Sequence, residues 1–316
     1  MYANFKYCIN LLGLMTKATN ELGGSVHYIL ASIHAALEAG RAILQVYHSA
    51  DLEVAQKADS SPLTLADRRA HEVILGRLTK FGMPVLSEEG RDIPYDERKS
   101  WDTFWLVDPL DGTKEFIKKN GEFTVNIALI SKSKPVAGVV LVPDRNRLYF
   151  ASSKLGSYKA DVSQIGDWLS TKLRDHGRSE NRSSSEAADT VSELISLSSH
   201  LPVNQSTDQP YTIAGSRSHA TPELEAFVEE KRRQYGQVEF ISAGSSLKLC
   251  LVAEGRADIY PRTGPTMEWD TAAGQAIVEN AGGKVLQYET EQPLLYNKEN
   301  LLNPWFVASR FQRLEV

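Results

Sequence analysis

The sequence predicts an α+β protein whose helices and sheets pack in layers. Two observations support this fold class. In the first half several strand patterns follow one another between helical stretches, and in the second half strands and helices alternate. With 316 residues, 42% of them hydrophobic, the chain has enough apolar side chains for one large domain or two smaller ones. We expect an α+β half at residues 25–160 and an α/β half at residues 210–316.

Two helical patterns open the first half. From Val26 to Tyr47 apolar residues recur at mostly helical spacing, which predicts a long packed helix. A second helix is expected from Pro62 to about Lys80, because proline is tolerated in a first turn, where its missing N–H has no partner. The apolar face of this second helix would bury Ala70, Val73, Ile74 and Leu78.

Strand patterns follow these helices. The short apolar run Phe104–Val107 is typical of a central strand, and Phe123–Ile130 has apolar residues alternating on one face. The segments Val136–Val142 and Arg147–Ala151 flank a turn at residues 143–146, which predicts a hairpin.

Two segments differ from the rest. Residues 161–209 contain a polar, low-complexity stretch that is poor in apolar anchors, so we expect a mobile surface insertion there. Residues 1–24 are interpreted as an N-terminal extension.

The second half alternates between strand and helix patterns. The expected elements are a strand at 211–214, helices at 222–235 and 245–254, a strand at 257–260, a helix at 271–281 and a strand at 304–309. Gly255 and Gly282 stand where helices end, as left-handed caps.

Charge and cysteine usage exclude some classes of function. A net charge of −5 argues against a broad nucleic-acid surface, so no nucleic-acid polymer is expected as a partner. Cys8 and Cys250 form no ligand pair and fit a reduced, intracellular setting. Because no stretch approaches about 20 consecutive apolar residues, no transmembrane segment is expected.

The most informative segment is Leu106–Phe116. A buried strand is expected to end at Asp108, where Pro109 would stop the ladder, so that Asp108 and Asp111 turn toward one spot and the Leu110 carbonyl is freed. These hard oxygen ligands suit Mg²⁺ or Mn²⁺. The alternative is a surface turn, since Asp, Pro and Gly are common turn residues.

Gly112 and Thr113 then open the next helix or turn. Their backbone N–H groups would form an anion site beside the metals. One short loop thus offers cation ligands and phosphate donors together.

Acids elsewhere have compatible contexts. Glu88 follows a short apolar strand, whereas Glu89 is interpreted as solvated or as tuning the site. Asp270 lies at a helix N-terminus, where it is either a ligand or an N-cap. Asp67 stands three residues after Thr64, close to a capping box that by itself explains both residues.

Three motifs carry a family resemblance. Residues 87–89, 108–113 and 269–273 resemble the inositol monophosphatase superfamily of lithium-sensitive, metal-dependent phosphatases, from about residue 25 onward. The resemblance implies a layered αβαβα sandwich of the sugar-phosphatase type. Within the superfamily the chain is similar to the CysQ type of 3′(2′),5′-bisphosphate nucleotidases. The motifs for that branch are Lys114–Phe116, Gly215–His219, Gly244–Lys248 and Tyr260–Arg262.

The resemblance also implies a set of metal ligands. Two or three Mg²⁺ ions, with Mn²⁺ as an alternative, would be held by Glu88, Asp108, the Leu110 carbonyl, Asp111 and Asp270. Thr113, with its hydroxyl oriented by Asp67, would position a water and help to deprotonate it. Glu88 is counted among the catalytic residues as well.

Substrate contacts are implied in both halves. Phosphate would meet Gly112, Thr113 and Lys114. The second half would hold a nucleoside at Gly244, Ser245 and Ser246. Arg217 or Arg262 would pair with a 5′-phosphate, although either is equally explained as a surface residue. His219 is interpreted as structural and Cys250 as packing.

The expected activity is hydrolysis of the 3′-phosphate of adenosine 3′,5′-bisphosphate, or of its sulfated form. The alternatives are an inositol monophosphatase or another sugar-phosphate phosphatase, a non-catalytic metal- or nucleotide-binding protein, and a structural domain whose acids are only caps and turns. We expect a cytoplasmic monomer or homodimer of sulfur metabolism, with or without peripheral contact to the inner membrane.

Overall fold

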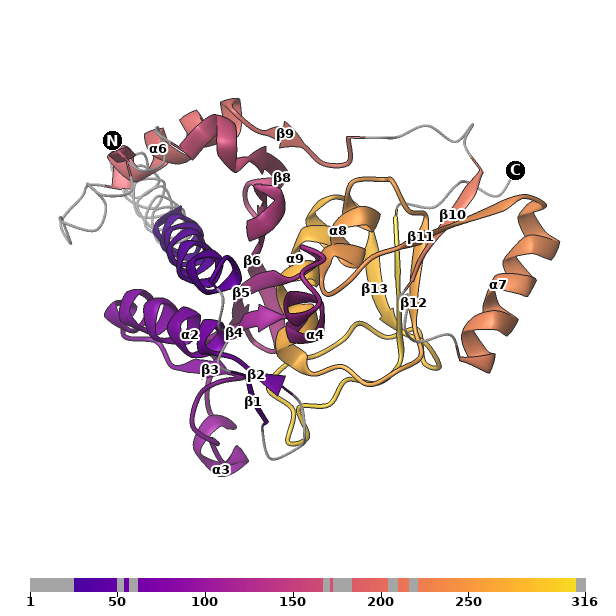
Figure 1. The fold of residues 1–316 in the computed structure, drawn as a ribbon, viewed down its shortest axis with the longest axis horizontal. Helices are drawn as coiled ribbons and strands as arrows, with labels where there is room; N and C mark the ends of the chain where they lie inside the picture. Colours follow the sequence, from indigo (N-terminus) through magenta and orange to yellow (C-terminus); the bar gives the residue numbers. More distant parts are fainter. Residues whose placement is uncertain are drawn as a thin grey trace, which may run out of the picture.

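The computed structural model describes residues 26–49, 54–56, 62–166, 171–172, 184–203, 210–215 and 221–310. In Figure 1 two helices lie at one side of the molecule, two sheets with helices between them occupy the middle, and α7 (Pro222–Tyr235) lies at the other side. The expected extension at residues 1–24 lies outside the described residues, as do Arg217 and His219.

A seven-stranded sheet forms the first half, in the order β3-β4-β5-β6-β7-β8-β9. Its strands are β3 (Val85–Ser87), β4 (Thr103–Asp111), β5 (Thr124–Ser131), β6 (Lys134–Val142), β7 (Arg147–Ser152), β8 (Gly156–Asp161) and β9 (Ser199–His200). Only the β3–β4 pair is parallel among these described strands, and the predicted β6–β7 hairpin is confirmed.

The end of β4 was predicted wrongly. β4 does not end at Asp108 but continues to Asp111, and its pairing with β5 is irregular between these two residues. Pro109 has no N–H for the ladder, so the chain bulges there and resumes pairing afterwards. The irregularity, and not a strand end, gives the acidic segment its shape.

A five-stranded sheet forms the second half, in the order β11-β10-β12-β14-β13. Its strands are β10 (Tyr211–Gly215), β11 (Val238–Ser242), β12 (Ile259–Arg262), β13 (Lys284–Gln287) and β14 (Phe306–Ser309). The sequence analysis did not anticipate β11 or β13. Both are edge strands, where burial is incomplete and hydrophobic alternation is weak.

The helices include those that the sequence predicts, with some ends shifted, and also two that it did not predict, at residues 95–98 and 184–196. They are Val26–Tyr47, α2 (Leu65–Leu78), α3 (Tyr95–Arg98), α4 (Thr113–Ile117), α6 (Ser184–Ser196), α7, α8 (Leu247–Ala253) and α9 (Glu268–Asn280), with 3₁₀ turns η1 (Thr79–Phe81) and η2 (Pro143–Arg145). Pro62 is not in the first turn of α2. It lies in the short strand β2 (Pro62–Leu63), paired with β1 (Ala55–Gln56), and Thr64 caps the helix.

The elements pack in five layers around three hydrophobic cores. Along β4, Trp105 and Val107 face a core shared with helix 26–47 and α2, whereas Phe104 and Leu106 face a core shared with α8 and α9. A third core joins Ile213 of β10 to Phe227 of α7. The order is therefore helices, sheet, helices, sheet, helix, which confirms the αβαβα sandwich (Figure 1).

Part of the expected insertion belongs to the fold. Within residues 161–209, helix α6 buries Ala187, Val191 and Leu194 against the first core, and β9 pairs with β8. These three residues are spaced as on one face of a helix, a signal that the polarity of the preceding stretch concealed. Treating the whole range as a surface insertion was wrong for residues 184–200.

The helix Val26–Tyr47 is long and apolar enough to cross a membrane by length and composition, with a mean hydropathy of 1.2. In the fold, 67% of that stretch is buried. Ile29, Leu30 and Ile33 pack into the first core. These are the properties of a core helix.

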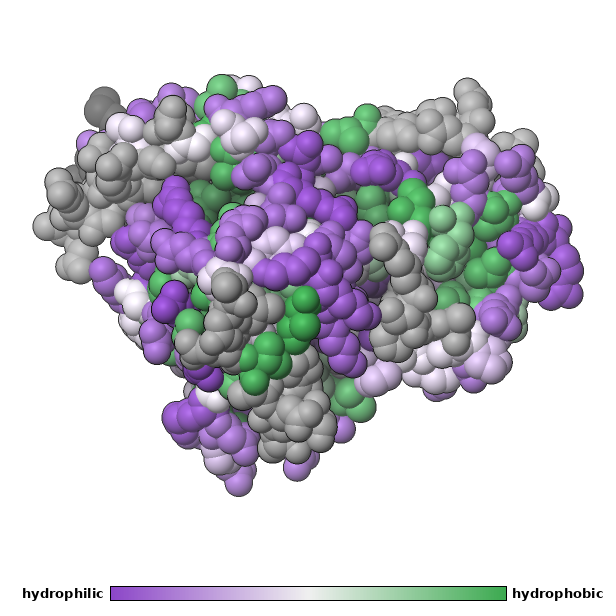
Figure 2. All heavy atoms as spheres, viewed as in Figure 1, coloured by the Kyte–Doolittle hydropathy of each residue, from purple (hydrophilic) through white to green (hydrophobic). Residues whose placement is uncertain are grey.

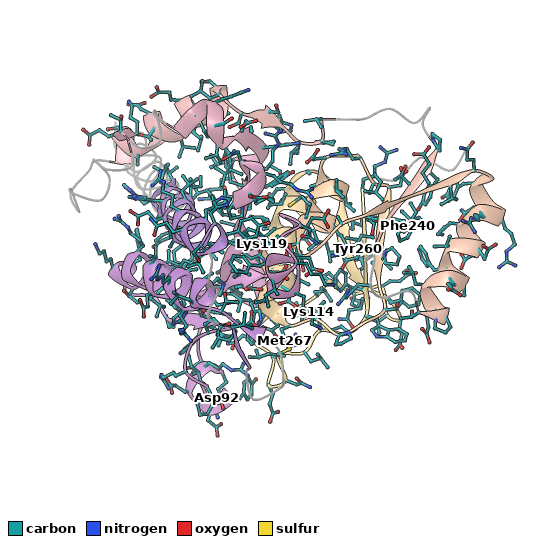
Figure 3. All side chains as sticks on the ribbon, in the orientation of Figure 1. Asp92, Lys114, Lys119, Phe240, Tyr260 and Met267 are labelled. Atoms are coloured by element: carbon teal, nitrogen blue, oxygen red, sulfur yellow. The ribbon has the colours of Figure 1, made fainter. Side chains whose placement is uncertain are left out.

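The visible surface differs between the two halves. Hydrophilic side chains cover the middle of the molecule in Figure 2, and hydrophobic ones gather over the second half near α7. Phe240 of β11, which is 47% exposed, is labelled in that region in Figure 3. In the same view Lys114 of α4 and Tyr260 of β12 lie toward the middle of the molecule, whereas Asp92 lies beside α3 at the periphery.

Candidate active site

The predicted acids lie together because neighbouring elements end at one place. Since β3 and β4 are parallel, Ser87 pairs with Val107, and the next residue, Glu88, donates its backbone N–H to the Val107 carbonyl at 3.1 Å. Glu88 thus lies beside Asp108. Asp270 joins them from the first turn of α9.

Electrostatics show how closely these acids approach one another. Asp108 is only 1% exposed, and burial raises its pKa well above the ordinary value, as do the charges of Glu88, Asp111 and Asp270. Burial and the Asp111 charge likewise raise the pKa of Asp270. A solvated surface turn, the alternative for this segment, is wrong, because a residue in such a turn would be exposed.

Asp111 is held from three directions. The Ser246 backbone N–H donates to its Oδ2 at 2.7 Å, and the Ser246 hydroxyl oxygen and the Asn126 amide nitrogen lie 3.1 and 3.5 Å from the same oxygen. Burial raises the pKa of Asp111, and the charge of Lys248 opposes that rise. All three contacts use the same oxygen, Oδ2, and Oδ1 takes part in none of them.

The bulge in β4 shapes the rest of the loop. The Leu110 N–H donates to Asp108 Oδ1 at 3.0 Å, and the Leu110 carbonyl lies 3.4 Å from the Thr113 hydroxyl. Gly112 caps α4 with a φ of 88°, a left-handed conformation that favours glycine. A Cβ there would also meet the Glu122 carbonyl and Ser245, each at 3.2 Å.

Asp67 contacts both Thr64, as a helix cap, and Thr113, as the sequence analysis expected. Its Oδ2 accepts from the Thr64 N–H at 2.7 Å and from the Thr64 hydroxyl at 2.5 Å, which completes the capping box of α2. Its Oδ1 accepts from the Thr113 hydroxyl at 3.3 Å. The cap therefore fixes the carboxylate that orients Thr113.

Asp270 is not an N-cap. Met267 occupies that position, and Asp270 is the third helical residue, whose Oδ2 accepts the Met267 N–H at 2.9 Å. The helix begins three residues earlier than predicted, so the carboxylate is anchored from behind by its own first turn.

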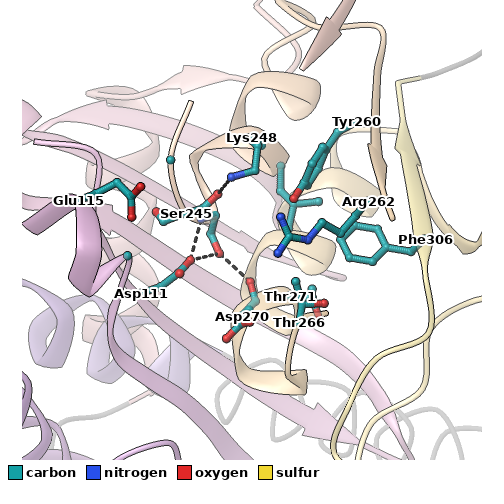
Figure 4. A pocket seen from close by; sticks show the side chains of 14 residues that line it. Asp111, Glu115, Ser245, Lys248, Tyr260, Arg262, Thr266, Asp270, Thr271 and Phe306 are labelled. Atoms are coloured by element: carbon teal, nitrogen blue, oxygen red, sulfur yellow. Dashed lines mark hydrogen bonds between the residues drawn. The ribbon is translucent and has the colours of Figure 1, made fainter. Parts of the chain in front are cut away.

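A cleft of about 140 Å³ opens between the two halves (Figure 4). Of the predicted residues, its lining includes Asp111, Gly112, Gly244, Ser245, Arg262 and Asp270. The predicted residues that the structure describes but that are not part of this lining are Asp67, Glu88, Asp108, Leu110, Thr113 and Lys114, and Lys114 is exposed on α4.

Cations lie opposite the acids in this cleft. Arg262 donates through Nη2 to the Pro265 carbonyl at 2.8 Å, and its buried Nε has no hydrogen-bond partner among the described residues. Lys248 is buried, donates to the Ser245 carbonyl at 2.8 Å and lies 5.4 Å from the centre of the Tyr260 ring. Burial lowers the pKa of Lys248 to about 8 and raises that of Tyr260 to about 12.

Lys248 is the main site residue that the sequence analysis missed, together with Glu115, Tyr260 and Thr266 of the lining. A signal was present, because Lys248 is the one charged residue within the apolar helix α8. Buried lysines are rare without a partner, so a single lysine within an apolar helix indicates a polar site beside it.

The donor set fits Mg²⁺. Buried carboxylates that raise one another's pKa gain from a shared cation, and carboxylate and carbonyl oxygens are its preferred ligands. Among the residues that the structure describes, no three His, Cys, Asp or Glu side chains already surround one point. Mg²⁺ does not need such a cage, since it usually takes one or two carboxylates, several waters and substrate phosphate.

Together, the five-layered sandwich and the buried acids facing cations across a cleft define a class of metal-dependent, phosphate-handling α+β proteins. Residues 26–310 match the inositol monophosphatase family. The chain belongs to that family.

Relatives within the family are similar over nearly their whole length. The 3′(2′),5′-bisphosphate nucleotidase CysQ of Escherichia coli K12 is 43% identical over 279 residues, which cover 87% of this chain and 96% of the relative. The crystal structure of CysQ from Bacteroides thetaiotaomicron superposes with a TM-score of 0.76 at 48% identity, covering 90% of this chain and 98% of that one. The suhB protein of Bartonella henselae is more distant, with a TM-score of 0.62 at 25% identity, covering 89% and 92% of the two chains.

Proposed function

We propose that this protein is a Mg²⁺-dependent 3′(2′),5′-bisphosphate nucleotidase that converts adenosine 3′,5′-bisphosphate to AMP and phosphate. The observation that carries the proposal is the cleft itself, where buried acids face Lys248 and Arg262. A substrate with two phosphates suits a cleft with acids on one side and cations on the other. One phosphate can bind metal ions held by the acids, and the other can bind Lys248 and Arg262. The two CysQ relatives support the same activity.

Five groups of this chain would hold the ions. They are Glu88, Asp108, the Leu110 carbonyl, Asp111 and Asp270. Mg²⁺, when bound, supplies charge neutralisation at the phosphoryl group and a lowered pKa for a water. Mn²⁺ would fit the same oxygen donors.

The chain contributes orientation and proton handling. The Thr113 hydroxyl, held by Asp67 Oδ1 at 3.3 Å, orients the attacking water and takes part in removing its proton. Glu88, which lies beside Asp108, assists in that step. The backbone N–H groups of Gly112 and Thr113 bind the phosphoryl oxygens.

The second half binds the rest of the nucleotide. Gly244 and Ser245 lie along the cleft, and residue 244 is a glycine because a Cβ there would lie 2.6 Å from the Glu122 carbonyl oxygen. Arg262 binds the retained phosphate, with Lys248 adding charge from behind the turn. Arg217 lies outside the described residues and stays an expectation, as does a role for the exposed Lys114 in phosphate binding.

A phosphate-release screen tests this function. The panel would include adenosine 3′,5′-bisphosphate, its sulfated and 2′-phosphate relatives, inositol phosphates and sugar bisphosphates, each with and without Li⁺. We expect Mg²⁺-dependent release from the nucleotide bisphosphate that Li⁺ suppresses. Good turnover of an inositol phosphate with none of the nucleotide would instead identify an inositol monophosphatase.

A further inference from the structure

A buried polar pair on β5 lies outside the predicted site. Thr124 and Asn126 are 0% and 1% exposed, and they alternate with Val125 and Ile127, which face the first core. Both polar side chains therefore project from the opposite face of the strand, toward the start of α8. Buried polar groups in a central strand are unfavourable unless they are hydrogen-bonded, so their partners indicate what they do.

Their hydrogen bonds cross from one half of the molecule to the other. Thr124 donates its hydroxyl to Asn126 Oδ1 at 3.0 Å, and so accepts from the Ser245 hydroxyl, also at 3.0 Å. The first bond fixes the orientation of the Asn126 amide. Its Nδ2 then points to the Ser246 hydroxyl at 3.0 Å and to Asp111 Oδ2 at 3.5 Å.

Ser246 in turn forms hydrogen bonds with two aspartates. Its N–H donates to Asp111 Oδ2 at 2.7 Å, and its hydroxyl donates to the Asp270 carbonyl at 2.6 Å (Figure 4). Ser245 before it has a φ of 44°, a left-handed conformation that is unfavourable for serine. The turn therefore needs a stabilising contact from outside it, and the hydrogen bond between Thr124 and Ser245 provides one.

We propose that Thr124 and Asn126 are positioning residues that clamp the Ser245–Ser246 turn onto the acidic strand. Asn126 sets the Asp111 carboxylate for cation binding, and Thr124 sets Ser245 for the nucleotide. The inference rests on the proposed function for both the cation and the nucleotide. It makes β5, whose residues do not line the cleft, a determinant of both affinities.

Three variants separate the two roles, and a fourth is the control. Asn126→Leu removes the amide at similar size, Thr124→Val removes the hydroxyl, and Thr124→Ser restores it. The control, Thr190→Val, loses a buried hydroxyl that donates to the Glu186 carbonyl at 2.8 Å within α6, away from the cleft. Each variant is assayed for Mg²⁺ binding by calorimetry, for kcat and KM on adenosine 3′,5′-bisphosphate, and for Tm.

We expect Asn126→Leu to weaken Mg²⁺ binding by about 10- to 100-fold, the usual effect of losing a group that orients a metal ligand. Thr124→Val should raise KM several-fold with a smaller change in kcat, and Thr124→Ser should recover most of the wild-type KM. Thr190→Val should lower Tm alone.

The proposal is overturned if Asn126→Leu and Thr124→Val lower Tm as the control does while Mg²⁺ affinity and KM stay at wild-type values. If Asn126→Leu does not fold, Thr124→Val and Thr124→Ser decide the question through the same two readouts. A wild-type protein that binds Mg²⁺ but does not turn over the nucleotide would contradict the proposed function, and the Mg²⁺ affinities would still test the clamp.

Discussion

The side chain of Asp67 combines a helix-capping contact with a contact to a distant residue. One carboxylate oxygen caps α2 and the other receives the Thr113 hydroxyl, so a local structural role holds the group in place for a distant one. A capping box is a common local pattern, and sequence proximity explains it completely. The second contact spans 46 residues of chain, which no local pattern reports.

Asp67→Ala removes the partner of both Thr64 and Thr113. We expect kcat to fall by about 10²- to 10⁴-fold, the usual contribution of a proton-transfer arrangement, with little change in Mg²⁺ affinity. Stability should fall by about 1 kcal/mol through the lost cap. Thr64→Ala is the control, since it loses the cap and keeps the Thr113 contact. Equal losses of kcat in both variants would mean that Asp67 acts only as a cap.

Asp111→Asn tests the ligand assignment. Turnover should fall by at least about 10²-fold, as expected when a charge-stabilising group is lost. The amide keeps an oxygen for the Ser246 N–H. Because burial raises the pKa of Asp111, the neutral side chain should leave the Tm of the metal-free protein unchanged or higher. Phosphate release and thermal melting check both statements, and an active variant would contradict the assignment.

At the scale of elements, the site depends on how closely α9 approaches the first sheet. Gly138 of β6 makes this possible, because a Cβ there would lie 2.4 Å from the Ala273 carbonyl oxygen and 2.9 Å from Ala276 Cβ. The same helix carries Asp270 in its first turn. A shift of α9 would therefore move one acid relative to those on β4.

Gly138→Ala should lower stability by about 1–3 kcal/mol, the usual result of overpacking, and should lower activity as well. Gly76→Ala in α2 is the matched control, since nothing lies within 4 Å of its added Cβ. That variant should gain about 0.5–1 kcal/mol, because alanine has less backbone entropy to lose than glycine. Urea melts of both proteins measure the difference, and equal effects would refute close packing at β6.

The two first-layer helices are joined by an ion pair with a predictable pH response. Arg77 contacts Glu38 in a bidentate pair at 2.6 and 2.7 Å. The hydrogen bond to His34, followed by the one to Arg77, lowers the pKa of Glu38 to about 2. A lowered pKa in the folded state means that the stabilisation is complete above the ordinary value of 4.5 and is lost as the pH falls toward 2.

Glu38→Gln should therefore cost about 1 kcal/mol near neutral pH, a figure reduced for solvent screening of a partly exposed pair. It should also flatten the decline of Tm between about pH 4.5 and 2. Asp96→Asn removes the exposed partner of Lys99 and should change little. An unchanged acid limb in Glu38→Gln would show that other groups dominate there.

At the scale of the whole molecule, the fold brings like charges together and holds them out of water. Burial, and then the charges of neighbouring acids, raise the pKa of both Asp108 and Asp270, so the metal-free protein carries an electrostatic penalty at its centre. A cation that binds only the folded state removes this penalty and shifts the unfolding equilibrium.

Mg²⁺ should accordingly raise the Tm, with a gain of about 2.7 kcal/mol at a concentration 100 times its Kd. NaCl at matched ionic strength controls for general screening. Asp111→Asn should lose most of the gain. If Mg²⁺ and NaCl act alike, the acids are only caps and turns.

The sequence predicted a large part of this molecule because its signals were local. The apolar period of helix 26–47, the β6–β7 turn and the left-handed Gly255 at the end of α8 each depend on neighbours in the chain. The predictions failed where tertiary contacts decide. β11 and β13 are strands because they pair with β10 and β14. The apolar face of α6 is identified only by its packing against the first core.

What the sequence alone determined is the chemistry that is available. The spacing of acids, glycines and threonines predicted hard oxygen ligands and an anion site, and it carried the family resemblance. Only the tertiary structure decided how these groups meet. The bulge after Asp108, the parallel pairing that sets Glu88 beside it and the clamp from β5 all join residues that are distant in the chain. Such contacts depend on how sheets and helices pack, and packing is a property of the whole chain and not of any one segment of it.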